Sequence, residues 1–195
     1  PSKEVVPLIE RSAGILMPIT SLPSEYGIGC FSKSAYDFVD WLKEAGQSYW
    51  QILPLCPTSY GDSPYQSFST YAGNPYFIDL DQLIEEKLLT RKECQACDFG
   101  DDPQDIDYGK LYENRFKLLR KAYERANVGE DQEFEAYRRE NAWWLDDYGL
   151  FMAVKDIFDG NSWDQWAEDI RYRWDNAMWY YNCLLYTSDA ADDKA

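Results

Sequence analysis

The sequence predicts an α/β protein in which a strand, a helix and a second strand are followed by a mainly helical segment. Two short apolar runs, residues 13–20 and 48–55, predict buried strands, and each leads into a loop containing proline. Between them, residues 34–45 carry apolar side chains at helical spacing, and Gly46 follows where a helix commonly ends. From residue 112 onward the apolar spacing is helical.

The order strand, helix, strand has a consequence for where a ligand would bind. Such units build parallel sheets, either barrels or doubly wound sheets. In both architectures the ligand-binding groups lie at the carboxyl ends of the strands. The functional face is therefore expected to carry residues 21–29, after the first strand, and the loop from residue 56 onward, after the second.

Beyond the second loop, residues 77–80 predict a brief strand, 81–89 a short helix, and the acidic stretch 98–107 a solvated surface loop. Further helices are expected at 112–123, around Phe134 and Tyr137, at 141–158, and from Asp164 or Ala167 to about Tyr181, with Ser162 capping a turn before the last. Tryptophans at this spacing are expected in the core, with sugar platforms as the alternative.

Composition excludes several classes of function. A net charge of −16 disfavours nucleic acids and anionic membranes as partners. The absence of histidine excludes a Ser-His-Asp triad, a Cys-His pair and His-rich zinc sites within these residues. Cys94 and Cys97 form a CxxC pair in an acidic segment and are expected to be reduced thiols rather than a zinc or redox site. No signal peptide or membrane-spanning run is expected, so a reducing cytoplasm is the expected compartment.

The loop at residues 56–77 is the most informative segment. It is too long for a plain connector, and long loops in compact domains usually carry function. It combines hydroxyl and amide side chains with aromatic rings, and a sugar needs both, because its C–H face packs on a ring and its hydroxyls need partners. The alternative is a loop packed by its own side chains. Asp62 is expected to order the loop through local hydrogen bonds.

Several motifs in this loop and around it resemble one enzyme family. Gly61-Asp-Ser-Pro-Tyr-Gln-Ser67 and Ala72-Gly-Asn-Pro-Tyr76 resemble the N-terminal signature of the 4-alpha-glucanotransferases, also called amylomaltases or disproportionating enzymes. Ser21-Leu-Pro-Ser24 and Tyr26-Gly-Ile-Gly29 agree with that family too, as does Asp107-Tyr-Gly109. The resemblance covers roughly residues 10–181.

The resemblance implies a partial (β/α)8 TIM barrel with an α-helical insertion subdomain. Residues 1–90 would form the first βα units, with the sugar-binding loop 56–77, and residues 91–181 the helical insertion. Residues 182–195 depart from the helical pattern and are expected to be a non-native tail. The implied reaction transfers α-1,4-glucan segments with retention, which takes two carboxylates. In the family these lie on later strands, so no catalytic residue, metal or cofactor is expected in this chain.

The resemblance also assigns substrate-binding residues. Ser63 and Tyr65 match positions that touch the glucan near the cleavage point, and Tyr60 matches an aromatic of a secondary glucan groove, with Tyr108 as its partner. Asp62 completes the set of candidates, and the expected partners are malto-oligosaccharides and other α-1,4-glucans. Two alternatives remain: part of an α-glucan hydrolase, or a stand-alone carbohydrate-binding module. Two strands cannot close a barrel, which argues against the module, and their exposed edge is expected to cause aggregation.

Overall fold

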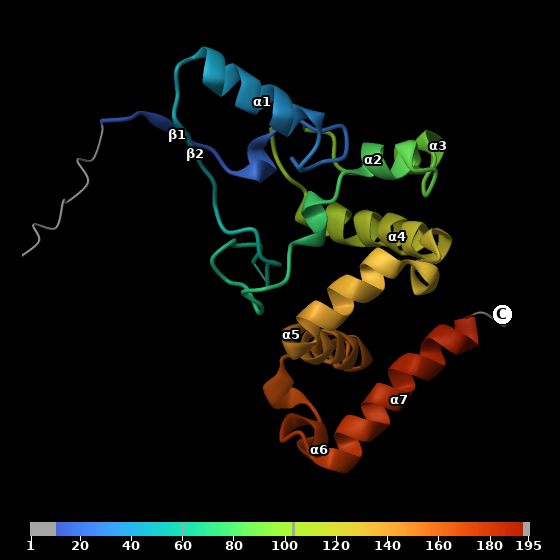
Figure 1. Cartoon of the computed structure of the whole chain (residues 1–195). Helices are drawn as coiled ribbons and strands as arrows, with labels where there is room; N and C mark the ends of the chain where they lie inside the picture. Colours follow the sequence, from blue (N-terminus) through green and yellow to red (C-terminus); the bar gives the residue numbers. More distant parts are fainter. Residues whose placement is uncertain (1–10, 60, 103, 193–195) are drawn as a thin grey trace, which may run out of the picture. The chain divides into compact units, whose positions relative to one another are not determined.

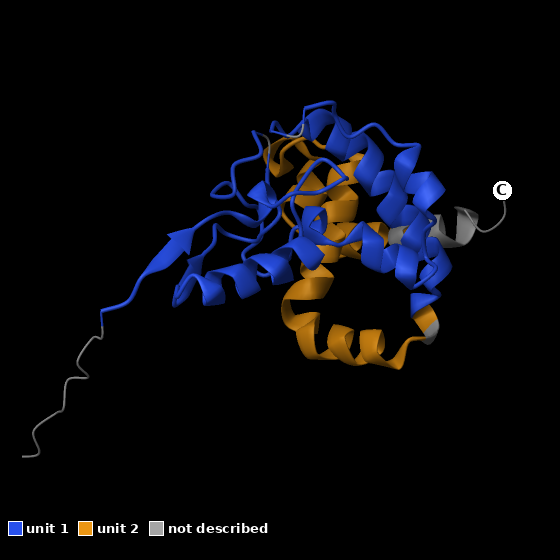
Figure 2. Cartoon of the chain, turned by 90° about the horizontal axis from the view of Figure 1, so that it is seen from above, with its two compact units in different colours: residues 1–128 blue, residues 129–195 orange. Residues whose placement is uncertain are grey.

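The computed structural model describes residues 11–59, 61–102 and 104–192, and the chain divides into two compact units, residues 1–128 and 129–195 (Figure 2). Unit 1 contains β1 (Gly14–Leu16), the 3-10 helix η1 (Ile19–Ser21), α1 (Lys33–Glu44), β2 (Tyr49–Gln51), η2 (Pro75–Phe77), α2 (Leu80–Glu85), α3 (Arg91–Gln95) and α4 (Tyr108–Ala126) (Figure 1). The 3-10 helix η3 (Val128–Glu130) lies at the boundary, and unit 2 contains α5 (Gln132–Ile157), η4 (Trp163–Gln165), α6 (Glu168–Arg171) and α7 (Asp175–Asp192).

The predicted strand, helix and strand at the start of unit 1 are confirmed. β1 and β2 pair in parallel, with Gly14 opposite Tyr49, and α1 connects them. A side chain at Gly14 would place its Cβ 2.6 Å from the Tyr49 carbonyl oxygen, so the close approach of the strands requires glycine. α1 begins where the Ser32 side chain accepts a hydrogen bond from the Ser34 N–H, and Gly46 follows its end with φ +70°.

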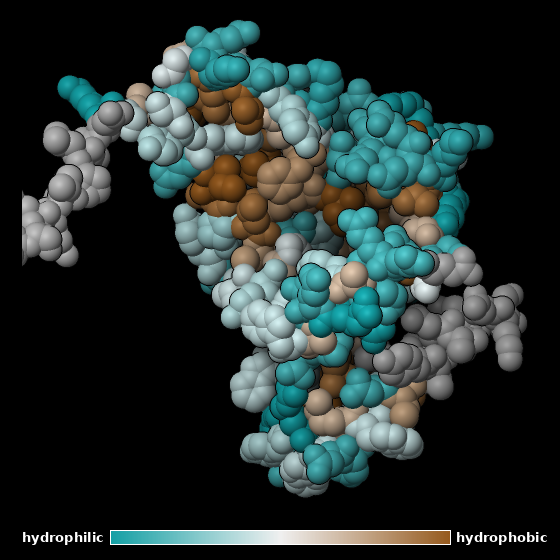
Figure 3. Space-filling model, in the orientation of Figure 1, coloured by the Kyte–Doolittle hydropathy of each residue, from teal (hydrophilic) through white to brown (hydrophobic). Residues whose placement is uncertain are grey.

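The strands are shorter and less buried than expected. Ile15 and Trp50 are half-buried, and they lie on the face that packs near the cluster of Ile19, Leu22 and Ala35. The neighbouring side chains alternate to the opposite face and stay exposed, 58% at Leu16 and 65% at Tyr49. Figure 3 shows apolar residues gathered on the surface beside β1 and below α1. The prediction of buried strands is therefore wrong for this two-stranded sheet, because one of its faces is uncovered.

The segment after the long loop is helical where residues 77–80 were expected to form a strand. Asn74 accepts a hydrogen bond from the Tyr76 N–H and so caps η2, and Asp79 caps α2 in the same way. Each of these caps starts a helical turn, one at Asn74 and one at Asp79. The short segment between them cannot form the extended strand expected at residues 77–80. α3 was missed, although its capping box, formed by Thr90 and Glu93, is a recognisable sequence signal.

The main core of unit 1 joins the loop region to α2, α3 and α4. Its buried members are Tyr26, Ile28, Tyr76, Leu80, Leu89, Cys94, Phe99, Leu111, Leu118 and Ala122. Because α3 and α4 complete this core, the compact unit extends to residue 128. Cys94 lies in α3 within the core, not in a loop, and the Cys97 thiol lies 3.5 Å from the Glu93 carbonyl oxygen.

Unit 2 departs from the sequence prediction in its helix boundaries. α5 is one helix of 26 residues where two were expected, since neither glycine nor proline interrupts it before Gly149. α6 and α7 are separate, and Arg173 between them has φ +57°. α7 continues to Asp192, so the expected end of the helix near Tyr181 is wrong. The buried core of this unit is formed by Leu150, Val154, Trp166, Ile170, Ala177 and Tyr181.

The tryptophans of unit 2 do not follow the expected core placement. Only Trp166 among those described there is buried, at 8% exposure. Four others are at least half exposed, namely Trp143 (67%), Trp163 (55%), Trp174 (51%) and Trp179 (70%). The helical periodicity therefore located an aromatic-rich unit correctly but not which rings face inward.

Candidate functional site

A cavity of about 90 Å³ lies in unit 1 where the chain leaves β1 and β2. Its walls come from the segment after β1, the long loop after β2, and the first turn of α4. The lining residues are Pro18, Ile19, Thr20, Ile28, Leu53, Pro54, Leu55, Thr58, Asp62, Pro64, Asn74, Tyr76, Phe77 and Tyr108. The cavity thus occupies the carboxyl ends of the parallel strands, as the sequence analysis predicted.

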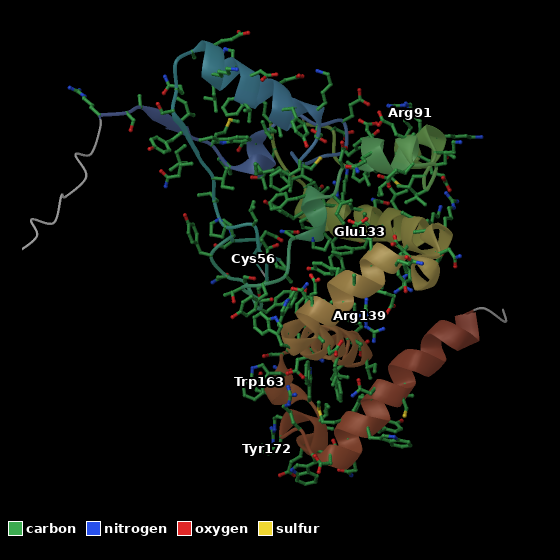
Figure 4. The ribbon with its side chains drawn as sticks, viewed as in Figure 1. Cys56, Arg91, Glu133, Arg139, Trp163 and Tyr172 are labelled. Carbon is green, nitrogen blue, oxygen red and sulfur yellow. The ribbon has the colours of Figure 1, made fainter. Side chains whose placement is uncertain are left out.

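Backbone hydrogen bonds hold the long loop in place without strand pairing. The Asn74 N–H donates to the Leu55 carbonyl at 2.9 Å and closes the base of the loop. Nearer the tip, the Ser59 N–H donates to the Gln66 carbonyl at 2.9 Å. The Cys56 thiol lies 3.7 Å from the Thr70 carbonyl oxygen, inside the same loop (Figure 4). A loop closed at base and tip can present its side chains in a fixed arrangement.

Asp62 lies in a left-handed turn of this loop and faces the cavity. Its φ is +56°, and its N–H donates to the Ser59 carbonyl at 3.1 Å. Its carboxylate accepts no hydrogen bond from the described residues, so the local hydrogen bond expected of Asp62 is made by its backbone N–H. Only its backbone closes the turn. Burial raises the pKa of the Asp62 carboxyl, which is the direction expected for a carboxylate without a compensating donor.

Two tyrosines share the cavity with Asp62. The rings of Tyr76 and Tyr108 are 6.3 Å apart at 51°. Burial, and then the negative charge of Asp62, raises the pKa of Tyr76 to about 12, and the same two causes raise the pKa of Tyr108. Both phenols therefore stay neutral donors at physiological pH. One carboxylate acceptor, two phenolic hydroxyls and two rings form a set that can hold a sugar by its hydroxyls and its C–H face.

The structure brings only part of the predicted site together. Asp62 and Tyr108 both line the cavity. Ser63 and Tyr65 belong to the same turn but lie outside the lining: the Ser63 hydroxyl accepts from the Tyr65 N–H at 3.3 Å, and Tyr65 is 73% exposed. Tyr60 falls outside the described residues.

Sequence reasoning missed Tyr76 as a site residue, although it noted the ring among the aromatic residues of the loop. The signal lies in the Asn74-Pro75-Tyr76 run. An asparagine that caps a turn beginning with proline fixes the direction of the next side chain. Tyr76 is thereby buried at 6% exposure and lines the cavity.

Arg115 is hydrogen-bonded to the end of η2, the 3-10 helix that carries Tyr76. It projects from α4, is fully buried at 0% exposure, and donates from one terminal nitrogen to the Ile78 carbonyl at the end of η2. Its Nε and other terminal nitrogen have no hydrogen-bond partner among the described residues. Burial lowers the pKa of Arg115, but a guanidinium remains protonated. An arginine on an amphipathic helix is ordinarily exposed, so the sequence pattern did not single it out.

Two further findings concern metal sites and membrane-spanning helices among the described residues. They contain no group of three or more cysteine, aspartate or glutamate side chains placed to hold a metal ion. No helix in this part of the chain combines the length and the apolar character that crossing a bilayer would require.

Comparison with known proteins gives a consistent family. The family model described as 4-alpha-glucanotransferase matches residues 17–188. The chain is 54% identical over 157 residues to a 4-alpha-glucanotransferase of Clostridium butyricum, covering 80% of this chain and 32% of that protein. It is 49% identical over 174 residues to the Streptococcus pneumoniae enzyme, covering 88% and 34%. The chain thus spans about a third of the length of these curated relatives.

A solved structure agrees with the sequence matches. The amylomaltase from Streptococcus agalactiae in complex with acarbose superposes with a TM-score of 0.85 at 40% identity, covering 91% of this chain and 36% of that one. The resemblance found in the loop motifs is thereby confirmed. With its family match extending over residues 17–188, the chain belongs to the 4-alpha-glucanotransferase family.

Proposed function

We propose that this chain is the glucan-positioning part of a 4-alpha-glucanotransferase, which transfers α-1,4-glucan segments to an acceptor glucan or glucose with retention. The observation that carries the proposal is the convergence of Asp62, Tyr76 and Tyr108 on one cavity, within a chain that belongs to this family. Malto-oligosaccharides are the proposed ligands. Acarbose, which is bound in the similar amylomaltase, is an analogue of them.

In this proposal, β1, α1 and β2 are the first βα units of a (β/α)8 barrel, and unit 2 is part of a helical insertion. The parallel pairing of the two strands and the similarity to an amylomaltase support this architecture. A complete barrel takes about 250 residues, and the remaining strands would cover the exposed face of β1 and β2. The five free cysteines fit the cytoplasmic compartment that we propose.

The cavity itself is suited to binding and not to bond cleavage. Retaining transfer uses two carboxyl groups about 5–5.5 Å apart. Among the described residues that line the cavity, Asp62 is the only one with a carboxylate. We therefore assign the nucleophile and the acid–base residue to sequence outside these 195 residues, and we expect the isolated chain to be inactive.

Ser63 and Tyr65 receive the role of contacting the glucan next to the cleaved bond. The exposure of Tyr65, 73%, leaves its ring free to stack on a sugar. By the family resemblance, Tyr60 and Tyr108 are assigned to a secondary glucan groove; Tyr108 lines the cavity that also contains Asp62 and Tyr76.

A chimera tests the proposal. Residues 1–181 of this chain replace the matching third of the Streptococcus agalactiae amylomaltase, and the product is incubated with maltotriose. We expect glucose together with longer malto-oligosaccharides, and neither product from the 195-residue chain alone.

Each alternative predicts a different result for the same chimera. Glucose and maltose without longer products would favour an α-glucan hydrolase. A stand-alone binding module would bind maltoheptaose as tightly in the 195-residue chain as in the chimera, and would give no transfer activity to it.

A further inference from the structure

A second cavity, of about 170 Å³, lies wholly within unit 2 and has no part in the proposed reaction. Its floor is apolar and is built by three helices: Leu150 and Val154 from α5, Ile170 from α6, and Met178 from α7. These residues belong to, or pack against, the core cluster of the unit, so the floor is part of the fold and not a surface irregularity.

One wall of this cavity is an exposed tryptophan held by a buried one. Trp163 and Trp166 both line the cavity, but Trp163 is 55% exposed and Trp166 only 8%. Trp166 anchors the turn: its indole N–H donates to the Asn161 carbonyl at 3.1 Å, and its ring stacks on Phe158 at 6.0 Å. The anchored turn carries Trp163, which is labelled in Figure 4 and lines the cavity. Because the turn is already fixed, little conformational entropy would be lost when the Trp163 ring binds a ligand.

Polar groups of both signs lie at the same opening. Asp147 accepts a hydrogen bond from Arg173 at 2.7 Å, and both side chains are more than half exposed. Arg171 donates from one terminal nitrogen to the Asp164 carbonyl at 3.1 Å, and its guanidinium lies 5.0 Å from the centre of the Tyr172 ring. The Nε of Arg171 is buried without an acceptor among the described residues. A buried donor without an acceptor is unfavourable, so Arg171 is held here by its other contacts and by packing.

This combination selects a class of ligand. An apolar floor and an indole face suit the C–H side of a pyranose ring, and the paired Asp147 and Arg173 suit its hydroxyls. An anion is disfavoured because Asp147 already neutralises Arg173 and the chain carries a net charge of −16.

We propose that the unit 2 cavity is an accessory binding site for a glucose unit of an α-1,4-glucan. The choice of this sugar rests on the proposed function of the family site in unit 1. The cavity shares no lining residue with the site in unit 1, so its loss should weaken binding without removing the reaction.

The test follows the indole N–H signals of the whole 195-residue chain, labelled with ¹⁵N-tryptophan, during titration with maltose. We expect the Trp163 and Trp166 signals to shift and saturate in the millimolar range. Trp163→Ala should weaken the affinity reported by Trp166 at least tenfold, and Trp163→Tyr, which keeps an aromatic face, should stay within about threefold of the parent. Asp147→Ala should weaken it about threefold.

Trp179→Ala is the matched control, since this ring is 70% exposed in the same unit but does not line the cavity; we expect unchanged binding. Unshifted Trp163 and Trp166 signals at saturating maltose would overturn the inference, as would shifts caused by n-propanol but not by maltose. The two proposals fail separately. An active chimera with silent Trp163 and Trp166 signals removes only the accessory site, and a maltose-responsive cavity with an inactive chimera removes only the transferase function.

Discussion

The two sides of unit 1 are built from similar side chains but reach different degrees of packing. On the helical side, around α2, α3 and α4, Leu80, Leu111 and Leu118 are at most 1% exposed. On the strand side, around β1, β2 and α1, Leu16, Tyr49 and Trp41 are more than half exposed. Helices bury their apolar stripe against neighbours close in sequence, whereas a parallel strand needs further strands and covering helices. The difference indicates that the helical side carries the stability of the unit.

The site cavity lies between these two sides. The helical side contributes Ile28, Tyr76 and Tyr108 to its lining. The strand side contributes Ile19 and Phe77. The residues that would hold a sugar therefore lie between the tightly packed helical side and the more exposed strand side.

The largest expected effect comes from a pair of identical substitutions on the two sides. Leu118→Ala should lower the free energy of unfolding by about 3 kcal/mol, because it leaves a void in a closed core. Leu16→Ala removes the same atoms from an exposed position and should cost less than about 0.5 kcal/mol. Urea unfolding followed by circular dichroism measures both. Equal losses would mean that the strand side is packed in solution as tightly as the helical side.

A second prediction concerns Arg115, the buried cation of the helical side. Arg115→Ala should cost about 3 kcal/mol, because it empties a buried volume and removes the hydrogen bond to the Ile78 carbonyl. Arg115→Met fills most of that volume without burying unpartnered nitrogens, and it should stay within about 1 kcal/mol of the parent. The same urea titration compares them. A methionine variant as unstable as the alanine variant would show that the charge itself stabilises the unit.

The contrast also explains what sequence could predict. The strand, helix and strand were located by apolar runs and by Gly46, and the site loop by its motifs, because these signals act within a few residues. The burial of β1 and β2 was mispredicted, since it depends on elements beyond the local pattern. Arg115 escaped for a related reason: its burial is created by α4 packing against the end of η2, which no single window of sequence contains. The cap of Tyr76 is local, but its burial in the core with α4 is not.

Tyr76 gives the third prediction, because it belongs both to the helical core and to the cavity. Its folded-state pKa, about 12, is above the ordinary value of 10.0, so the fold favours the neutral phenol. The corresponding stability is present below pH 10 and is lost as pH rises toward 12, by up to about 2 kcal/mol. Urea midpoints measured between pH 9 and 12 should fall less steeply for Tyr76→Phe than for the parent chain. Parallel slopes would contradict the burial of this hydroxyl.

Asp62 gives the smallest expected change in stability and the clearest separation of stability from binding. Burial raises the pKa of its carboxyl, so the fold is favoured by the neutral form at low pH and loses that stability as pH rises through the folded pKa. Asp62→Asn keeps the left-handed turn, which asparagine tolerates, and removes the charge. At pH 7 it should raise the urea midpoint slightly, and at pH 3 it should leave the midpoint unchanged. In the chimera it should weaken maltotriose binding, because an acceptor for sugar hydroxyls becomes in part a donor. Replacing a residue that serves only folding should not make the chain more stable. A higher urea midpoint together with a higher KM would therefore identify Asp62 as a ligand contact. A lower urea midpoint would indicate a structural role in the loop.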